Sequence, residues 1–110
     1  MYFSEKEKYT SELLFTKIKE LKTSSFVFSY TEDLILSVVL EDFYDSDNGE
    51  EYGSKDFDEY NEWSVHIIRV IKDKKEIVSG KKFLELNYKN FPQQISTLNG
   101  EIIYNKEIKF

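Results

Sequence analysis

Apolar residues recur at every second position in short segments from residue 24 onward, and this spacing most constrains the fold. The clearest run places Leu34, Leu36, Val38 and Leu40 on one face. A period of two is that of a β-strand rather than a helix. The segments between most of these runs are short, whereas a parallel connection needs a crossover of about a dozen residues or more. The pattern therefore predicts an antiparallel sheet.

The alternating runs define the strands that we expect. They cover residues 24–30, 34–44, 63–72, 76–79, 82–88 and 101–110. The run at 34–44 is partly apolar on both faces, which is typical of a central strand. Alternation predicts that the inward-facing residues are Trp63, Val65, Ile67 and Ile71 in the third strand and Ile102, Tyr104 and Ile108 in the last.

Residues 92–98 allow two interpretations. One is a short helix, with Pro92 at its first position and Gly100 just past its end. The other is a strand joined through Asn99-Gly100 to the last strand, because Asn-Gly is a strong signal for a two-residue hairpin turn. We favour the helix, since Gln93, Gln94, Ser96 and Thr97 are poor strand formers.

The N-terminal segment has the period of a helix, over residues 4–22. Ser4 and Glu7 have the spacing of a capping box, and Leu14, Ile18 and Leu21 recur at helical intervals. Together with the strands, this helix predicts a single α+β domain spanning residues 1–110. Its N-terminal helix should pack on one face of a five- to six-stranded, mainly antiparallel sheet.

Residues 41–63 form an acidic segment that also contains six aromatic rings. Ten carboxylates stand against Lys55 alone, so the segment carries a charge of −9 and the rest of the chain +3. We expect residues 41–43 and 57–63 to be strand ends, with Phe43, Phe57 and Trp63 packed on the sheet. The remainder should be a long connection, and such connections are usually functional or disordered. Its aromatic residues argue against disorder.

We interpret this connection as a surface that binds a basic protein. Tyrosine beside carboxylates suits such a role, because the rings supply contact area while the charges steer and pair with the partner's Arg and Lys. The alternative is a solvated loop. The predicted partner-binding residues are Tyr44, Asp45, Asp47, Glu50, Glu51, Tyr52, Asp56, Asp58, Glu59 and Tyr60.

The sequence gives no sign of catalytic or metal-binding residues. It has no cysteine, and its one histidine, His66, lies in the middle of an expected strand. The run from Asp45 to Asp56 resembles a calcium loop, but Glu50 stands where the sharp turn needs glycine, and the last ligand is Asp rather than Glu. We therefore expect a protein that is not an enzyme and that needs no cofactor or metal.

The overall composition bears on partners and location. A net charge of −6 disfavours nucleic acid and anionic membranes as direct partners. The longest apolar run, at residues 34–40, is far shorter than the roughly 20 residues of a membrane-spanning helix, and the N-terminus has no signal-peptide pattern. We expect a cytoplasmic protein. The lysines at 72–75 and 81–82 are interpreted as turn and edge residues that discourage sheet association.

These features support three hypotheses of function. The first is an immunity protein that occludes the basic active-site cleft of a cognate toxin, most concretely a nuclease, whose cleft must attract a polyanion. The second is an anti-defence protein of the anti-CRISPR type, whose carboxylates imitate nucleic-acid phosphates. The third is a structural or assembly module with a charged surface loop.

Overall fold

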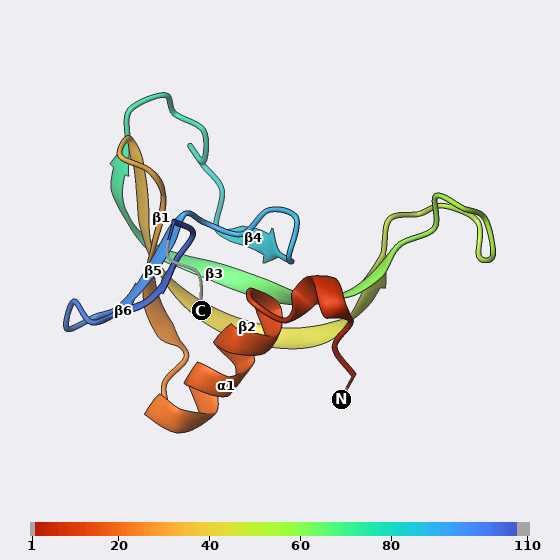
Figure 1. Ribbon diagram of the computed structural model, residues 1–110. Coiled ribbons are helices and arrows are strands. Elements are labelled where there is room, and N and C mark those ends of the chain that lie inside the picture. Colours follow the sequence, from red (N-terminus) through yellow and green to blue (C-terminus); the bar gives the residue numbers. More distant parts are fainter. Residues whose placement is uncertain (1, 108–110) are drawn as a thin grey trace.

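The strands form one six-stranded, wholly antiparallel sheet with a helix on one face, as the sequence predicts. The computed structural model describes residues 2–107 (Figure 1). Its strands lie in the order β4-β3-β2-β1-β5-β6, so β2 is central, as expected. The elements are η1 (Glu5–Glu7), α1 (Ser11–Leu21), β1 (Ser25–Thr31), β2 (Leu34–Asp47), β3 (Glu59–Asp73), β4 (Phe83–Leu86), β5 (Gln94–Thr97) and β6 (Ile102–Asn105).

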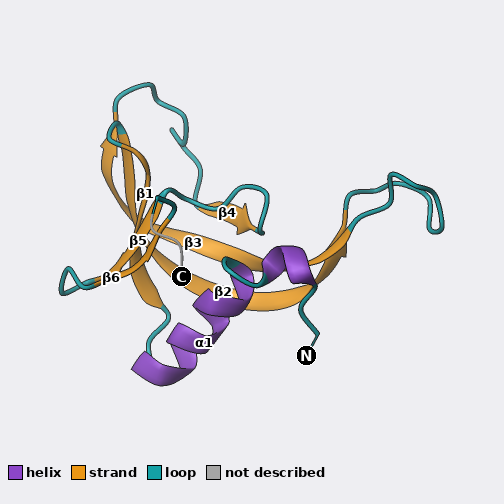
Figure 2. Cartoon of the chain, viewed as in Figure 1, coloured by secondary structure: helices purple, strands orange, loops and turns teal. Residues whose placement is uncertain are grey.

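The core lies between α1 and the sheet face that it covers (Figure 2). In β1, Phe26 and Phe28 have no exposed surface, and they pair with Val38 and Leu36 of β2. Leu14 of α1 packs into the same cluster and is 2% exposed. The four alternate residues of β2 that the sequence places inward are all buried, so the period of two is confirmed.

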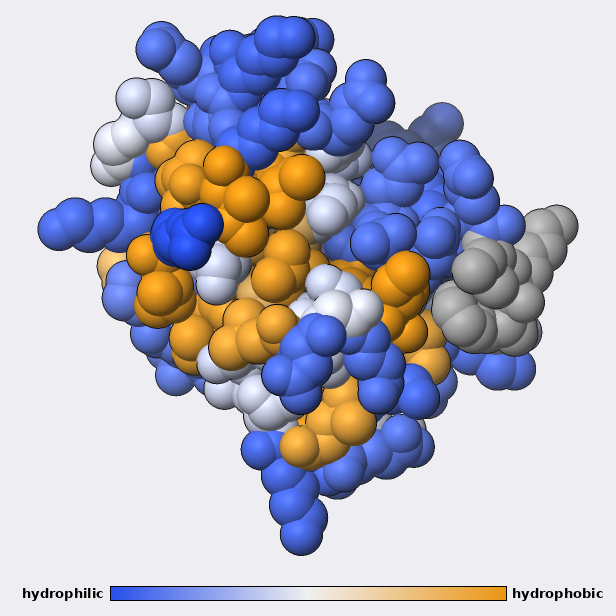
Figure 3. All heavy atoms as spheres, turned by 90° about the vertical axis from the view of Figure 1, so that its left-hand side faces the viewer, coloured by the Kyte–Doolittle hydropathy of each residue, from blue (hydrophilic) through white to orange (hydrophobic). Residues whose placement is uncertain are grey.

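The opposite sheet face carries a partly exposed apolar surface. Alternation along β1 and β2 turns Val27, Ile35 and Val39 to this side, where each is half-buried. Figure 3 views the molecule from the left-hand side of Figure 1 and shows apolar residues gathered there, bounded by hydrophilic ones.

The N-terminal helix is shorter than predicted and is preceded by a separate turn. Residues 5–7 form the 3₁₀ turn η1, and α1 begins only at Ser11. Thr10, with φ −124° and ψ −90°, breaks the helical geometry between them. The predicted pairing of Ser4 and Glu7 is present, since Glu7 Oε1 accepts the Ser4 backbone N–H at 3.1 Å. The break allows Glu7 to turn into the protein while α1 follows its own path.

The predicted strand at 76–79 is wrong. Asp73 ends β3, and its two carboxylate oxygens accept the backbone N–H groups of Ile77 and Val78, each at 2.8 Å. These bonds fold the segment into turns and bury Val78 in the core. Side-chain acceptors thus replace the sheet partners that a strand would have needed.

The favoured helix at 92–98 is also wrong, and the hairpin interpretation is confirmed. β5 and β6 pair across the Asn99-Gly100 turn, where Gly100 has φ +92°. Ile95 has no exposed surface and pairs with Phe28 of β1. Burial of this one residue between two strands outweighs the weak strand propensity of its polar neighbours.

Bulges change which residues of β3 and β6 face inward. In β3, Trp63, Val65 and Ile67 are buried as predicted, but Ile71 is 43% exposed because register shifts break the alternation. A further shift in the β5–β6 pairing leaves Ile102 53% exposed, whereas Tyr104 faces inward as predicted. Ile103 is buried instead of Ile102. The prediction for Ile108 lies outside the described residues.

Candidate functional site

The acidic segment is a two-stranded ribbon that extends from the sheet. The strand ends predicted at residues 41–43 and 59–63 are confirmed, whereas residues 44–47, predicted to lie in the connection, continue β2. β2 and β3 remain paired as far as Asp47 and Glu59, so the connecting loop is only residues 48–58. The pair projects away from the rest of the molecule (Figure 1). We call residues 44–60 the acidic ribbon.

A bulge and a stacked pair of rings mark the base of the acidic ribbon. The register shifts between Leu40 and Phe43, which leaves Glu41 and Asp42 out of the pairing. Phe43 then stacks on Trp63 with ring centroids 4.1 Å apart. Phe43 and Trp63 therefore pack on the sheet as predicted, and beyond them both strands leave the core.

Asn48 organises the loop at the end of the ribbon. Its Nδ2 donates to the carbonyl of Asp56 at 2.7 Å, and its Oδ1 accepts the backbone N–H groups of Glu50 and Asp58. Its own backbone N–H donates to the carbonyl of Asp58 at 3.0 Å. One side chain thus ties both arms of the loop together.

The outer end of the loop presents an exposed tyrosine among carboxylates. Tyr52 is 85% exposed, and its ring meets that of Phe57 edge to face. Phe57 therefore supports the loop rather than joining the core cluster, unlike its predicted packing on the sheet. Glu50, Glu51 and Asp56 are exposed around them.

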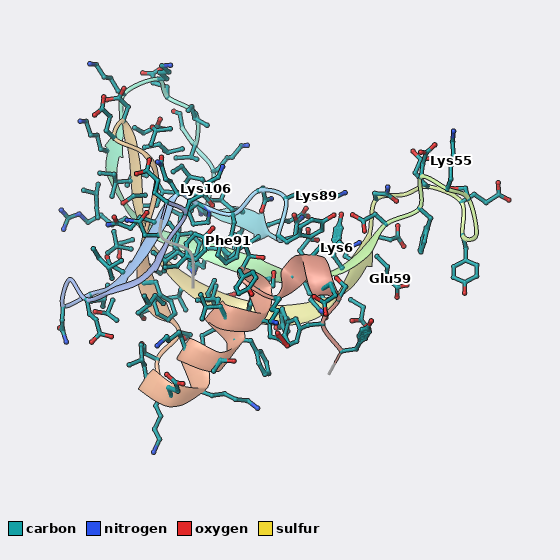
Figure 4. The ribbon with its side chains drawn as sticks, in the orientation of Figure 1. Lys6, Lys55, Glu59, Lys89, Phe91 and Lys106 are labelled. Atoms are coloured by element: carbon teal, nitrogen blue, oxygen red, sulfur yellow. The ribbon has the colours of Figure 1, made fainter. Side chains whose placement is uncertain are left out.

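Most carboxylates of residues 41–63 lack a compensating cation. Asp58 pairs with lysines, Glu41 lies 3.2 Å from His66, and Glu62 accepts a hydrogen bond from Asn87. The other seven have no ion pair with any described residue, and Lys55 lies far out on the loop (Figure 4). These seven are Asp42, Asp45, Asp47, Glu50, Glu51, Asp56 and Glu59.

Two of the predicted partner-binding residues are instead engaged within the protein. Asp58 forms ion pairs with Lys6 and Lys89 and accepts the hydroxyl of Tyr88, and its side chain is only 15% exposed. Tyr60 donates to the carbonyl of Asp47 and lies under the Lys89 ammonium. Figure 4 shows Lys6 and Lys89 at the base of the ribbon. This cluster fixes the ribbon and leaves little of Asp58 to a partner.

Tyr44 is at the surface but also contacts a buried carboxylate. Its ring is 39% exposed, and its hydroxyl donates to Glu62, which is 5% exposed and also accepts from Asn87 at 2.8 Å. Burial of the hydroxyl raises the pKa of Tyr44, and the charges of Glu62 and Glu85 raise it further. Glu62 thus anchors the turn after β4 to β3.

A buried polar contact at the base of the ribbon involves residues outside the predicted surface. Glu7 is 1% exposed, and its Oε2 accepts the backbone N–H of Asn61, itself 3% exposed, at 2.9 Å. The only sequence signal for Glu7 was its capping-box spacing with Ser4. Nothing in the spacing indicates that the same carboxylate also reaches β3.

A pocket of about 340 Å³ lies where the N-terminal segment meets the ribbon. It is lined by Tyr2, Ser4, Glu7, Asp45, Glu59, Tyr60 and Asn61. Three of these residues carry carboxylates and none is a lysine or arginine. The pocket thus unites part of the predicted surface, Asp45, Glu59 and Tyr60, with the N-terminal segment.

The structure also locates the residues weighed for metal binding and catalysis. The first residues of the calcium-like run, Asp45 and Asp47, lie on β2 in strand geometry. Within residues 2–107 there is no group of three or more His, Asp or Glu side chains placed to hold a metal ion. His66 stacks on Phe83 with ring centroids 4.7 Å apart. No helix in the described range is long and apolar enough to cross a membrane.

Comparison with known proteins identifies the family. A family model described as "Cognate immunity protein YxxD" matches residues 9–108. The comparisons with curated proteins and with solved structures gave no match. The matched region includes α1 and all six strands. The chain therefore belongs to the YxxD family of cognate immunity proteins.

Proposed function

We propose that this immunity protein neutralises a nuclease toxin by placing the end of its acidic ribbon in the toxin's basic active-site cleft. The observation that carries the proposal is the projection of seven uncompensated carboxylates on and beside a ribbon that leaves the core. A nuclease must attract a polyanionic substrate, so its cleft is electropositive. The ribbon offers that cleft a competing negative surface, and inhibition is by occlusion rather than by catalysis.

The contact surface consists of the predicted residues that remain available. Asp45, Asp47, Glu50, Glu51, Asp56 and Glu59 supply the charge, and Tyr52 and Tyr44 supply the rings. Charge steering raises association rate constants from about 10⁵–10⁶ to as much as about 10⁸–10⁹ M⁻¹s⁻¹ at low salt. Burial of the exposed Tyr52 ring should then slow dissociation, since tyrosine is among the residues that dominate binding energies.

The decisive experiment reverses the charge of the ribbon. The probe is the cognate toxin domain, assayed for nucleic-acid cleavage and for binding. Reversal of Asp45, Asp47, Glu50 and Glu51 together to lysine should abolish both binding and protection. The matched control reverses four exposed glutamates away from the ribbon, Glu32, Glu76, Glu101 and Glu107, which gives the same net charge.

The outcomes separate the elements of the proposal. Loss of inhibition in the ribbon variant but not in the control supports recognition through the ribbon. Equal inhibition by the ribbon variant and the wild type would refute it. Cleavage of nucleic acid by the toxin, with its substrate competing against this protein for the cleft, supports the nuclease class, and a toxin that leaves nucleic acid intact would refute that class.

A further inference from the structure

The pocket between the N-terminal segment and the ribbon has the lining of a site for a cation. Asp45 and Glu59 contribute exposed carboxylates, and the lining contains no basic residue. The third carboxylate, Glu7, is buried and already accepts hydrogen bonds from Ser4 and Asn61. The β2–β3 register pairs Asp45 directly with Asn61, and Glu59 precedes Asn61 by two positions. Asp45, Asn61 and Glu59 therefore lie on one face of the β2–β3 pair. Like charges gathered on one face repel each other. A bound cation would relieve that repulsion.

Asn61, which also lines the pocket, supplies a second and independent observation. Its Nδ2 donates to the carbonyl of Tyr2 at 2.8 Å and also lies 3.4 Å from both carboxylate oxygens of Glu7. These acceptors fix the orientation of the amide, because a flipped amide would turn its oxygen toward other oxygens. The opposite atom, Oδ1, is buried and has no hydrogen-bond partner among the described residues. A buried acceptor without a donor is energetically unfavourable.

We propose that this pocket receives an arginine side chain of the toxin. This assignment rests on the proposed function, because it names one contact within the same complex. A guanidinium carries five N–H donors in a planar fork, enough to reach carboxylates that are spread across the pocket and the Asn61 oxygen together. The exposed ring of Tyr2 in the lining suits a planar cation, which stacks on aromatic faces.

The geometry favours a guanidinium over the other cations. The pocket carboxylates belong to no group that could hold a metal ion within residues 2–107. A lysine ammonium has three donors at one point and does not span separated acceptors. Asn61 Oδ1 has almost no exposed surface, so entry requires movement of one lining residue. Tyr2, whose side chain is 73% exposed, is the lining residue that can move with the least loss of packing.

The first test needs no toxin. The full chain labelled with ¹⁵N is titrated with N-acetyl-arginine amide and followed by the side-chain and backbone amide signals of Asn61. We expect these signals to shift, with little response to the citrulline analogue, which has the same shape but no charge. Asp45→Asn with Glu59→Gln should weaken arginine binding about tenfold, which corresponds to about 1.4 kcal/mol. Unshifted Asn61 signals, or equal shifts with citrulline, would overturn the assignment.

The second test uses the toxin domain and separates this inference from the proposed function. The Asp45→Asn, Glu59→Gln pair should weaken toxin binding at least tenfold, whereas Glu32→Gln with Glu101→Gln, which changes net charge equally, should leave it within twofold. If the pocket pair binds like the wild type while reversal of Asp47, Glu50, Glu51 and Asp56, which do not line the pocket, abolishes binding, the arginine pocket is wrong. The proposed function then stands with a contact surface that excludes Asp45 and Glu59. If the wild type does not bind the toxin domain, the proposed function fails, and the arginine titration still decides on the pocket.

Discussion

The carboxylate of Glu7 fastens the N-terminal segment to the acidic ribbon through the backbone of Asn61. Oε2 accepts the Asn61 N–H at 2.9 Å, while Oε1 accepts the backbone N–H and hydroxyl of Ser4. Asn61 pairs with Asp45 on the neighbouring strand, so this contact braces both strands of the ribbon. One residue near the start of the chain thus fixes the base of a surface formed far along it.

Removal of this carboxylate should destabilise the protein. Glu7→Ala leaves the buried N–H of Asn61 without an acceptor, so the free energy of unfolding should fall by about 2–3 kcal/mol. Urea denaturation followed by tryptophan fluorescence measures the change, because Trp63 lies two residues from Asn61. The matched control is Glu5→Ala in the same turn, where the side chain is exposed and the change should be within about 0.5 kcal/mol. Equal effects of the two substitutions would contradict the anchoring role.

Asp58 and Glu50 are both acidic residues of the loop, yet they should respond in opposite ways. Asp58→Asn weakens ion pairs with Lys6 and Lys89, so it should lower the free energy of unfolding by about 1 kcal/mol and change toxin affinity little. Glu50→Gln should leave stability unchanged and weaken toxin binding. Denaturation and calorimetric binding on both variants test this split. A stronger binding defect in Asp58→Asn than in Glu50→Gln would mean that Asp58 contacts the toxin.

The carboxylates of Glu50 and Glu51 and the ring of Tyr52 should affect different rate constants of toxin binding. Charge reversal of Glu50 and Glu51 removes electrostatic steering, so it should lower the association rate constant at least tenfold and flatten its dependence on salt. Tyr52→Ala should instead raise the dissociation rate constant about tenfold or more, because it removes contact area that the complex with the toxin would bury. Surface plasmon resonance over a range of salt concentrations separates the two. A Tyr52→Ala variant with an unaltered dissociation rate would place this ring outside the interface.

Asn48 should control the order of the loop without contacting the fold's core. Asn48→Ala removes the acceptor for two backbone N–H groups and the donor to the carbonyl of Asp56. Hydrogen exchange at Glu50 and Asp58 should accelerate about tenfold, while exchange in β1 stays unchanged. Toxin binding should weaken through the entropy of ordering the loop. Unchanged exchange at both amides would show that the rest of the loop holds itself in place.

Tyr30 should make the free energy of unfolding fall as the pH rises through the alkaline range. Burial raises the pKa of Tyr30 from 10.0 to about 12. The unfolded chain therefore loses this proton at lower pH than the folded protein, so the stabilisation is complete below pH 10 and is lost as the pH rises toward 12. Near the middle of that range the loss is about 1 kcal/mol. Tyr30→Phe should remove this part of the pH dependence of the free energy of unfolding and, in a spectrophotometric titration, the last-ionising tyrosine. An unaltered alkaline limb in Tyr30→Phe would contradict the assignment.

The antiparallel sheet could be predicted because its signal is local. Alternation in β1 and β2 depends on adjacent residues, and Phe26, Phe28 and the inward residues of β2 are buried as expected. The strand at 94–97 could not be predicted in this way. Its propensities are weak, and it forms because Ile95 fills a place beside Phe28 that the sequence does not display. The segment after Asp73 could not be predicted either. Its alternation indicates a strand, but the Asp73 carboxylate accepts the backbone N–H groups of residues 77 and 78 and folds the segment into turns.

The acidic surface could be located from composition but not resolved into its parts. Charge alone makes Asp58 equivalent to Glu50, because it does not reveal that Lys6 and Lys89 come from distant segments to neutralise Asp58. The sequence likewise predicts a loop over most of the ribbon. Carboxylates are poor strand formers, but pairing with the opposite strand continues through Asp45 and Asp47. Cross-strand pairing is a property of both strands together, and neither strand's sequence displays it alone.

The two halves of β2 have different structural roles, and this difference decides where substitutions affect the core. Residues before the bulge at Glu41 and Asp42 fill the core, whereas those beyond Phe43 lie on a ribbon that only its partner strand and base contacts support. Substitutions at exposed surface positions usually alter stability by less than about 0.5 kcal/mol. Substitutions in the outer loop should therefore leave the domain folded. The bulge is thus a boundary between a part of β2 whose substitution disturbs the core and a part whose substitution does not.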